Sequence, residues 1–205
     1  MEKSWQRGLA PLDAARPAPK TSPVPPEPWT VIETEKLQAM RLFDLYRERK
    51  RSPRTGALHD FYVLEGVDWC NIVPLTEAGE VVMIRQFRHG TREITLEIPG
   101  GMVDATDPSP LEAASRELLE ETGYAADVVE PLGVIHPNPA IERHQCHTFV
   151  ARGARLVAEQ RFDQTEDIEV VLVPLREIPA RIASGEITHA LVVVAFAWLL
   201  GLRAP

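Results

Sequence analysis

Hydrophobic and polar positions divide the chain into a proline-rich start and a longer region with regular patterns. Residues 1–28 contain seven prolines and almost no periodic hydrophobic pattern, which predicts an extended or disordered leader. Three strand-like runs follow at residues 29–35, 42–49 and 61–74, separated by polar residues and by proline and glycine. We expect these runs to form a small antiparallel sheet.

The middle of the chain predicts two strands and a glycine loop. Residues 80–87 form an apolar run rich in strand-forming side chains. Residues 94–98 then alternate between apolar and polar side chains, and a Pro-Gly-Gly sequence follows at residues 99–101. We therefore expect the second strand to end in a glycine loop.

A helix is predicted directly after this loop. Ser109 and Glu112 form a capping box with proline at the first helical position, and Gly123 offers a left-handed stop. The helix is therefore expected over residues 110–122. Its apolar stripe consists of Leu111, Ala114, Leu118 and Thr122.

The same helix carries three glutamates on one surface. Glu117, Glu120 and Glu121 fall within an arc of roughly 100°, where like charges at these spacings repel. A solvated face normally mixes both signs, but only Arg116 is near, placed to pair with Glu120 four residues on. Because Mg²⁺ binds carboxylate oxygens and bridges to substrate phosphates, the acidic helix beside a glycine loop favours a metal site for phosphoryl chemistry.

The last part of the chain completes a mixed α/β pattern. We expect strands over residues 144–151 and 168–173. Helices are expected over residues 178–184 and 190–202, and the second is so apolar that it should be buried.

Composition narrows the possible functions. The chain has 205 residues, a net charge of −8 and a pI near 5.3, which gives no electrostatic footprint for nucleic acid or an anionic membrane. The most apolar stretch, residues 190–200, is far shorter than a membrane span, and no signal peptide is visible, so we expect a cytoplasmic protein. Cys70 and Cys146 are far apart in sequence and are expected to be buried and reduced.

The sequence from Gly101 through RELLEETG at residues 116–123 resembles the signature box of the Nudix hydrolases, which cleave nucleoside diphosphates linked to another moiety. Tyr124 stands where the family usually has an aliphatic residue. One extra residue separates Gly101 from Arg116, and Asp107 with the following proline replaces the family's glutamate before the helix. These departures affect the expected geometry of the loop more than the catalytic residues.

The resemblance extends over residues 29–202 and is greatest for the ADP-ribose pyrophosphatase branch. It is carried by IRQFRHG at residues 84–90, LEIPGG at 96–101, HPNPA at 136–140 and TEDIEV at 165–170. In that branch the N-terminal strands form a small sheet that exchanges contacts with a second subunit and completes the substrate site. The resemblance therefore implies a homodimer.

The resemblance also implies roles for individual residues. Mg²⁺, with Mn²⁺ as an alternative, would be held by Glu117, Glu120, Glu121, Glu166 and the Gly100 carbonyl. Glu166 or a helix glutamate such as Glu120 would be the base, and Arg116 would hold the glutamates in place. The resemblance places Arg85 and Arg88 near the substrate diphosphate. Independently of the resemblance, we expect Trp29 and Gly101 to contact the substrate.

Several of these residues have an ordinary structural alternative. Arg85 and Arg88 lie on opposite faces of a regular strand, so one of them can be a surface charge. Trp29, at the start of the small sheet, is the better candidate to stack on a nucleobase, whereas Trp69 fits core packing. Glu166 can be a surface acid beside Asp167, although Gln164 stands where some relatives carry a second glutamate.

Two further features remain open. The loop at residues 136–140 can line the site, as in related proteins, or form a surface turn. His136, His144 and His147 lack the spacing of a zinc site, so zinc is not expected.

Together these patterns predict an α/β protein with a Nudix-type α/β/α sandwich, a mixed sheet and a small N-terminal antiparallel β appendage. Residues 1–28 would be the leader, 29–65 the appendage and dimerisation element, and 66–205 the Nudix domain. The expected reaction is Mg²⁺-dependent hydrolysis of the pyrophosphate of a nucleoside diphosphate sugar, with ADP-ribose first. The alternatives are GDP-mannose or a dinucleotide polyphosphate as substrate, a non-catalytic nucleotide-sugar sensor, or a structural protein with a solvated acidic helix.

Overall fold

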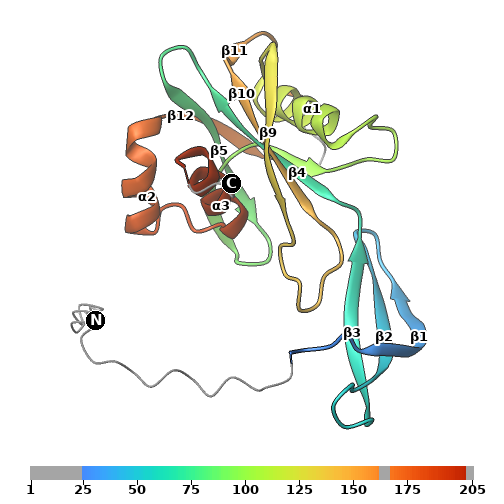
Figure 1. Cartoon of the computed structure of the whole chain (residues 1–205). Helices are drawn as coiled ribbons and strands as arrows, with labels where there is room; N and C mark the ends of the chain where they lie inside the picture. Colours follow the sequence, from blue (N-terminus) through green and yellow to red (C-terminus); the bar gives the residue numbers. More distant parts are fainter. Residues whose placement is uncertain (1–24, 162–166, 202–205) are drawn as a thin grey trace, which may run out of the picture.

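The computed structural model describes residues 25–161 and 167–201, so residues 1–24 of the predicted leader lie outside the described residues. Figure 1 shows a small sheet that projects from a larger layered body. The small sheet is antiparallel in the order β1 (Thr30–Ala39), β2 (Phe43–Arg51) and β3 (Leu58–Gly66). All ten residues of β1 are exposed. The predicted β appendage is therefore confirmed.

The larger body is built on a mixed sheet in the order β12-β5-β4-β10-β9. Only β4 and β10 run parallel, and the other pairs are antiparallel. Two short strands extend this sheet, because β6 pairs with β5 and β7 pairs with β4, and β8 and β11 form a separate ribbon. The strands are β4 (Trp69–Leu75), β5 (Glu80–Arg88), β6 (Glu93–Glu97), β7 (Gly100–Met102), β8 (Tyr124–Ala125), β9 (Val128–Ile135), β10 (Cys146–Arg152), β11 (Arg155–Leu156) and β12 (Ile168–Pro174).

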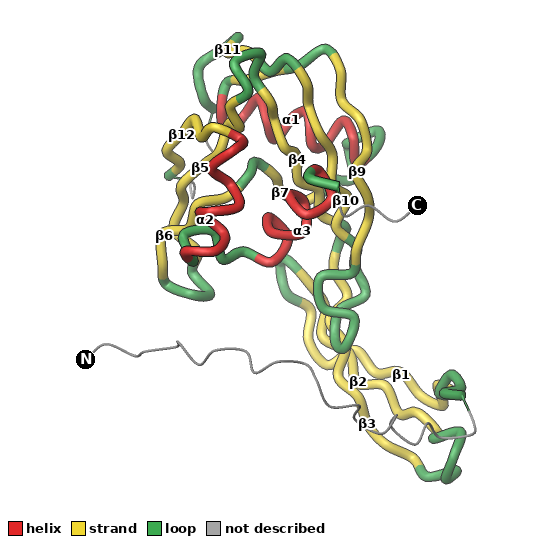
Figure 2. The backbone as a smooth tube through the Cα atoms, turned by 60° about the vertical axis from the view of Figure 1, so that its left-hand side comes forward, coloured by secondary structure: helices red, strands yellow, loops and turns green. Residues whose placement is uncertain are grey.

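Helices cover both faces of the sheet, which gives the predicted sandwich (Figures 1 and 2). The helix α1 (Pro110–Thr122) packs on one face, where Ala114 and Leu118 meet Ile72 and Phe149. The helices α2 (Ile178–Ser184) and α3 (Ala190–Leu199) lie on the other face with a short 3₁₀ turn, Leu175–Glu177, before them. There Phe196 packs with apolar side chains of the sheet. The core between α1 and the sheet fixes this helix relative to the strands beneath it.

Two predictions about the last helix need correction. The helix ends at Leu199 and not at residue 202, and Leu200 is half exposed. Only Val192, Ala195 and Phe196 of α3 are buried, because one side of this helix packs on the sheet while the other faces outward. Among the described residues, no helix has the length and apolar character that crossing a bilayer requires.

Candidate active site

The position of α1 follows from its end signals. The Ser109 hydroxyl accepts a hydrogen bond from the Glu112 backbone N–H at 3.4 Å, and the proline stands at the first helical position. Gly123 ends the helix with φ of 74°, and its N–H donates to the Leu119 carbonyl. The predicted bounds of this helix are confirmed.

The glycine loop lies directly against the carboxylates of α1. A Cβ atom on Gly101 would lie 2.5 Å from Oε1 of Glu117, and one on Gly100 would lie 2.3 Å from the Cys70 carbonyl oxygen. The Gly100 N–H donates to Oε2 of Glu121 at 2.9 Å, and the Glu121 side chain is buried. The loop can therefore approach α1 this closely only because Gly101 lacks a side chain, and it can lie this close to β4 only because Gly100 does.

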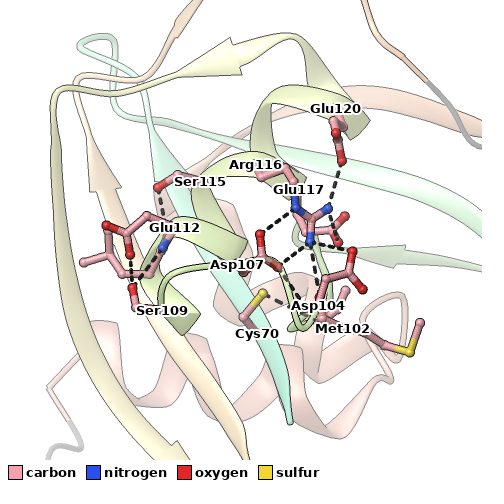
Figure 3. Close-up of polar contacts among 12 residues, drawn as sticks. Cys70, Met102, Asp104, Asp107, Ser109, Glu112, Ser115, Arg116, Glu117 and Glu120 are labelled. Atoms are coloured by element: carbon pink, nitrogen blue, oxygen red, sulfur yellow. Dashed lines mark hydrogen bonds and ion pairs between the residues drawn. The ribbon is translucent and has the colours of Figure 1, made fainter. Parts of the chain in front are cut away.

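Arg116 connects the helix to the loop (Figure 3). Its Nη1 donates to Glu117 and to Glu120, each at 2.9 Å, which confirms the predicted pair with Glu120. Its Nε and Nη2 donate to the two oxygens of Asp107 at 3.0 and 2.9 Å, and Nη2 also reaches the Met102 carbonyl at 3.3 Å. These hydrogen bonds, led by those to Asp107, raise the pKa of Arg116 and outweigh its desolvation.

The role of Asp107 was not predicted from the sequence. The Asp107 side chain is largely buried and forms a bidentate pair with Arg116. Its position in the sequence could have indicated this role, since Asp107 stands where the Nudix resemblance places a glutamate. Aspartate is shorter than glutamate, but the loop before the helix is one residue longer, and the Asp107 carboxylate still reaches Arg116.

These residues border a pocket of about 410 Å³. Of the predicted site residues it is lined by Gly100, Gly101, Glu117, Glu120, Glu121, Arg88 and Arg116. The structure also brings in Arg41, from the turn between β1 and β2, and Arg161, neither of which was predicted. Arg41 could not be found by local pattern because its approach depends on how the small sheet is attached.

The two arginines of β5 point in different directions, as expected for a regular strand. Arg88 lines the pocket and forms a bidentate pair with the buried Glu97. Arg85 instead pairs with Glu169 at 3.2 Å and lies 3.7 Å from Glu186. Arg85 therefore lies outside this pocket.

The two tryptophans also differ in position. Trp29 directly precedes β1, and its ring meets His59 and Phe61 of β3 edge-on at centroid distances of 5.6 and 5.2 Å. It does not line the pocket of its own chain. Trp69 does line it, and stacks on His144 at 6.1 Å.

A second, more apolar pocket of about 530 Å³ adjoins the first and shares Leu42 and Trp69 with it. Pro137 and Asn138 of the predicted 136–140 loop contribute to its wall. The loop therefore borders a cavity next to the carboxylates.

The donor set fits a hard divalent cation. Glu117, Glu120, Glu121 and Gly100 all line this pocket, and each carries an oxygen atom of the kind that such a cation binds. Among the described residues, no three His, Cys, Asp or Glu side chains lie close enough to hold a metal as a group. Mg²⁺ keeps several waters and takes only one or two carboxylates, so this arrangement suits it better than a closed cage. Glu166 and Gln164 lie outside the described residues.

Comparison with known proteins identifies the family. The model of the NUDIX domain matches residues 69–191. The chain belongs to the Nudix family. An ADP-ribose pyrophosphatase of Bacillus subtilis (strain 168) is 27% identical over 169 residues, covering 82% of this chain and 90% of the relative. An ADP-ribose pyrophosphatase of Mycobacterium tuberculosis is 28% identical over 174 residues, covering 84% and 82%.

The fold of this Nudix protein is also found among solved structures. A crystal structure of an ADP compounds hydrolase aligns with a TM-score of 0.76 and 22% identity, covering 87% of this chain and 96% of that one. This likeness confirms the predicted α/β fold. The chain is thus a Nudix hydrolase, and hydrolases of this family generally use divalent metal ions.

Proposed function

We propose that this Nudix hydrolase cleaves the pyrophosphate of a nucleoside diphosphate sugar, with ADP-ribose as its preferred substrate. The products would be a nucleoside monophosphate and a sugar phosphate. The observation that carries the proposal is the pocket in which Arg88 and the carboxylates of α1 share one wall with the glycine loop. The preference for ADP-ribose is supported by the names of the two relatives that match most of the chain.

We assign two or three divalent ions, Mg²⁺ with Mn²⁺ as an alternative, to Glu117, Glu120, Glu121 and the Gly100 carbonyl, with Glu166 as a further ligand. When bound, such ions neutralise the diphosphate and lower the pKa of an attacking water. Arg116 holds Glu117 and Glu120 in position by direct hydrogen bonds. The protein thus contributes a fixed arrangement of charge, which is the main need in phosphoryl chemistry.

The substrate's diphosphate is assigned to Arg88 and to the backbone at Gly101. The adjoining apolar pocket has a suitable size and lining for the sugar or the base, since ligand pockets typically measure about 300–1,000 Å³. Trp69 stands between the two pockets. In this proposal Arg85 has no direct contact with substrate, because Glu169 and Glu186 occupy it.

Residues 29–65 would join two subunits, and Trp29 would reach the site of the partner subunit. The exposed apolar side chains of the small sheet support this, because Trp29, Val31 and Ile32 each expose 40% or more of their surface. A cytoplasmic homodimer is therefore part of the proposal.

The test is an assay with Mg²⁺ and a panel of ADP-ribose, GDP-mannose and dinucleotide polyphosphates, with products identified by mass. We expect ADP-ribose to be cleaved with the highest kcat/KM. Glu121→Gln should reduce turnover by at least about a hundredfold, since it removes a metal-binding charge. Glu112→Gln on the same helix is the matched control, because the Glu112 side chain does not line the pocket and accepts from the Ser109 hydroxyl at the start of the helix, where a glutamine oxygen can also accept.

Other results would change the proposal in a defined way. Faster cleavage of GDP-mannose would keep the reaction and change the substrate. Binding of the nucleotides without turnover of any of them would favour a sensor. Full activity of Glu121→Gln at saturating Mg²⁺ would show that the metal assignment is wrong.

A further inference from the structure

Arg88 is held by a buried side chain that does not itself line the pocket of the carboxylates. Glu97, on β6, is only 2% exposed and accepts from Nε of Arg88 at 2.9 Å and from Nη2 at 2.6 Å. The Thr95 hydroxyl donates to Oε1 of Glu97 at 2.6 Å. The carboxylate is therefore fixed from two directions.

This geometry determines which edge of the guanidinium remains available. An arginine has five N–H donors, and the pair with Glu97 uses Nε–H and one hydrogen of Nη2. The two hydrogens of Nη1 and the second of Nη2 remain, and they form the outer edge of the fork. No other hydrogen bond to this side chain is found among residues 25–161 and 167–201. Because the outer edge of the fork matches two phosphate oxygens, the free donors suit a diphosphate.

Stability alone does not account for this pair. A buried ion pair costs desolvation that its attraction only partly offsets, and apolar residues of similar volume often serve as well. Burial by itself would raise the pKa of Glu97, but the hydrogen bonds from Arg88 and Thr95 outweigh it and keep the carboxylate charged. Here the arginine end of the pair also borders the pocket of the carboxylates, while the buried glutamate end borders only a small adjoining cavity.

We propose that Glu97 is a positioning residue: it turns the guanidinium of Arg88 so that its outer edge faces the substrate diphosphate, and Thr95 holds Glu97 in the required orientation. This inference rests on the proposed function, because it needs Arg88 to bind the diphosphate. A free arginine must lose rotamer freedom when it binds, and Glu97 removes that loss in advance. The effect should therefore appear in the KM for substrate more than in kcat.

The test is a double-mutant cycle with Arg88→Ala, Glu97→Gln and the double variant, measured with ADP-ribose and Mg²⁺. Glu97→Gln should lower kcat/KM by about ten- to a hundredfold, the range expected for hydrogen bonds to a charged group. In the Arg88→Ala background it should change kcat/KM by less than about threefold, because a residue that acts only through Arg88 loses its effect with it.

Three controls separate positioning from a structural role. Glu93→Gln, on the same strand and opposite Arg88 in the sheet register, should keep normal kinetics because the Glu93 side chain is exposed, and within the described part of the chain the Arg88 guanidinium bonds to Glu97 and not to Glu93. Thr95→Ser should rescue the loss seen with Thr95→Val, since it keeps the hydroxyl. Thermal unfolding of every variant shows whether a loss reflects unfolded protein.

Three results would overturn the inference. They are an unchanged KM in Glu97→Gln with only a lower melting temperature, an equal loss in the Arg88→Ala background, and a loss that falls wholly on kcat. A wild-type protein that cleaves no nucleotide would refute the proposed function separately. In that case calorimetry gives the Kd for inorganic pyrophosphate of the wild type, the two single variants and the double variant, and the cycle is calculated from these values. Non-additive losses there would support the role of Glu97, and additive losses or no binding would refute it.

Discussion

Arg88 and Arg116 organise the charged side chains of the pocket, and each divides its donors differently. Arg116 contacts carboxylates on all sides, with Asp107 on one edge and Glu117 and Glu120 on the other. Arg88 commits one edge to Glu97, and no other residue of the described ranges bonds to its second edge. The first is therefore suited to maintain the shape of the acidic wall, and the second to meet a substrate.

The pair of Asp107 with Arg116 predicts a pH dependence of stability. The hydrogen bonds from Arg116 hold the pKa of Asp107 below its ordinary value. The stabilisation is complete above the pKa of the unfolded chain, about 4, and is lost as the pH falls through the lower pKa of the folded state. In urea titrations, the stability difference between wild type and Asp107→Asn should thus be largest near neutral pH and shrink below about pH 4.

Asp104→Asn provides the control for this titration. Asp104 is more exposed and lies 3.7 Å from Arg116, so its substitution should have a small effect at every pH. A difference for Asp107→Asn that stays constant from pH 7 to pH 3 would contradict the assignment of the charge pair.

Glu166 gives a second prediction for a single residue. A general base contributes on the order of 10²- to 10⁴-fold, so Glu166→Gln should lower kcat strongly and leave KM within a small factor. Asp167→Asn, one residue away, should change little. Similar behaviour of the two variants, or near-normal kcat in Glu166→Gln, would move the role of base to a glutamate of α1.

Among the elements, those with strong local signals could be predicted and those shaped by distant contacts could not. The helix α1 was predicted to its end residues because Ser109, the following proline and Gly123 each determine a boundary locally. The strand β9 was missed because Pro131 and Gly133 break its pattern. Both are tolerated there for tertiary reasons: β9 is an edge strand, its register shifts beside Pro131, and a Cβ on Gly133 would lie 2.9 Å from the Trp198 ring.

In the pocket, too, contacts set by local sequence could be predicted and contacts set by distant parts of the chain could not. The glutamates of α1, the glycine loop and the Arg116–Glu120 pair follow from sequence spacing within one helix and its neighbouring loop. The hydrogen bonds between Arg88 and Glu97 do not follow from sequence spacing, because the two residues are not opposite each other in the register of β5 and β6. They depend on how the long arginine side chain runs along the hairpin.

The end of α1 offers a test at this scale. Gly123 has a positive φ of 74°, and a Cβ there would lie 2.2 Å from the Ala158 carbonyl oxygen. Gly153 has a similar φ of 70°, but a Cβ at that position would meet no atom within 4 Å. Gly153→Ala should cost about 1–2 kcal/mol of unfolding free energy for the left-handed backbone alone.

Gly123→Ala should cost clearly more than Gly153→Ala, because the backbone at Ala158 must also move. Chemical denaturation of both variants measures the difference. Equal losses would show that the contact with Ala158 is relieved at no cost.

At the scale of the whole molecule, a single chain does not explain how the small sheet is stabilised. Three strands need a covered apolar face for stability, yet all of β1 is exposed and its apolar side chains include Val31 and Ile32. In Figures 1 and 2 the sheet stands away from both helical layers. A second copy of the chain is the proposed cover.

We expect sedimentation of the wild-type protein to give a dimer at assay concentration. The double variant Val31→Glu/Ile32→Glu should sediment as a monomer and lose activity, because it places charge on both sides of β1. Glu33→Gln, in the same strand, should remain dimeric. A fully active wild-type monomer would refute the shared site.

The separation of Trp29 from the carboxylates of its own chain has a genetic consequence. A site that takes Trp29 from one subunit and Glu121 from the other can be inactivated by a change in either. A strain that carries one allele with Trp29→Ala and another with Glu121→Gln would assemble mixed dimers, in which both defects fall on one site and the other site is intact. Two alleles that are each defective alone should therefore complement each other when expressed together.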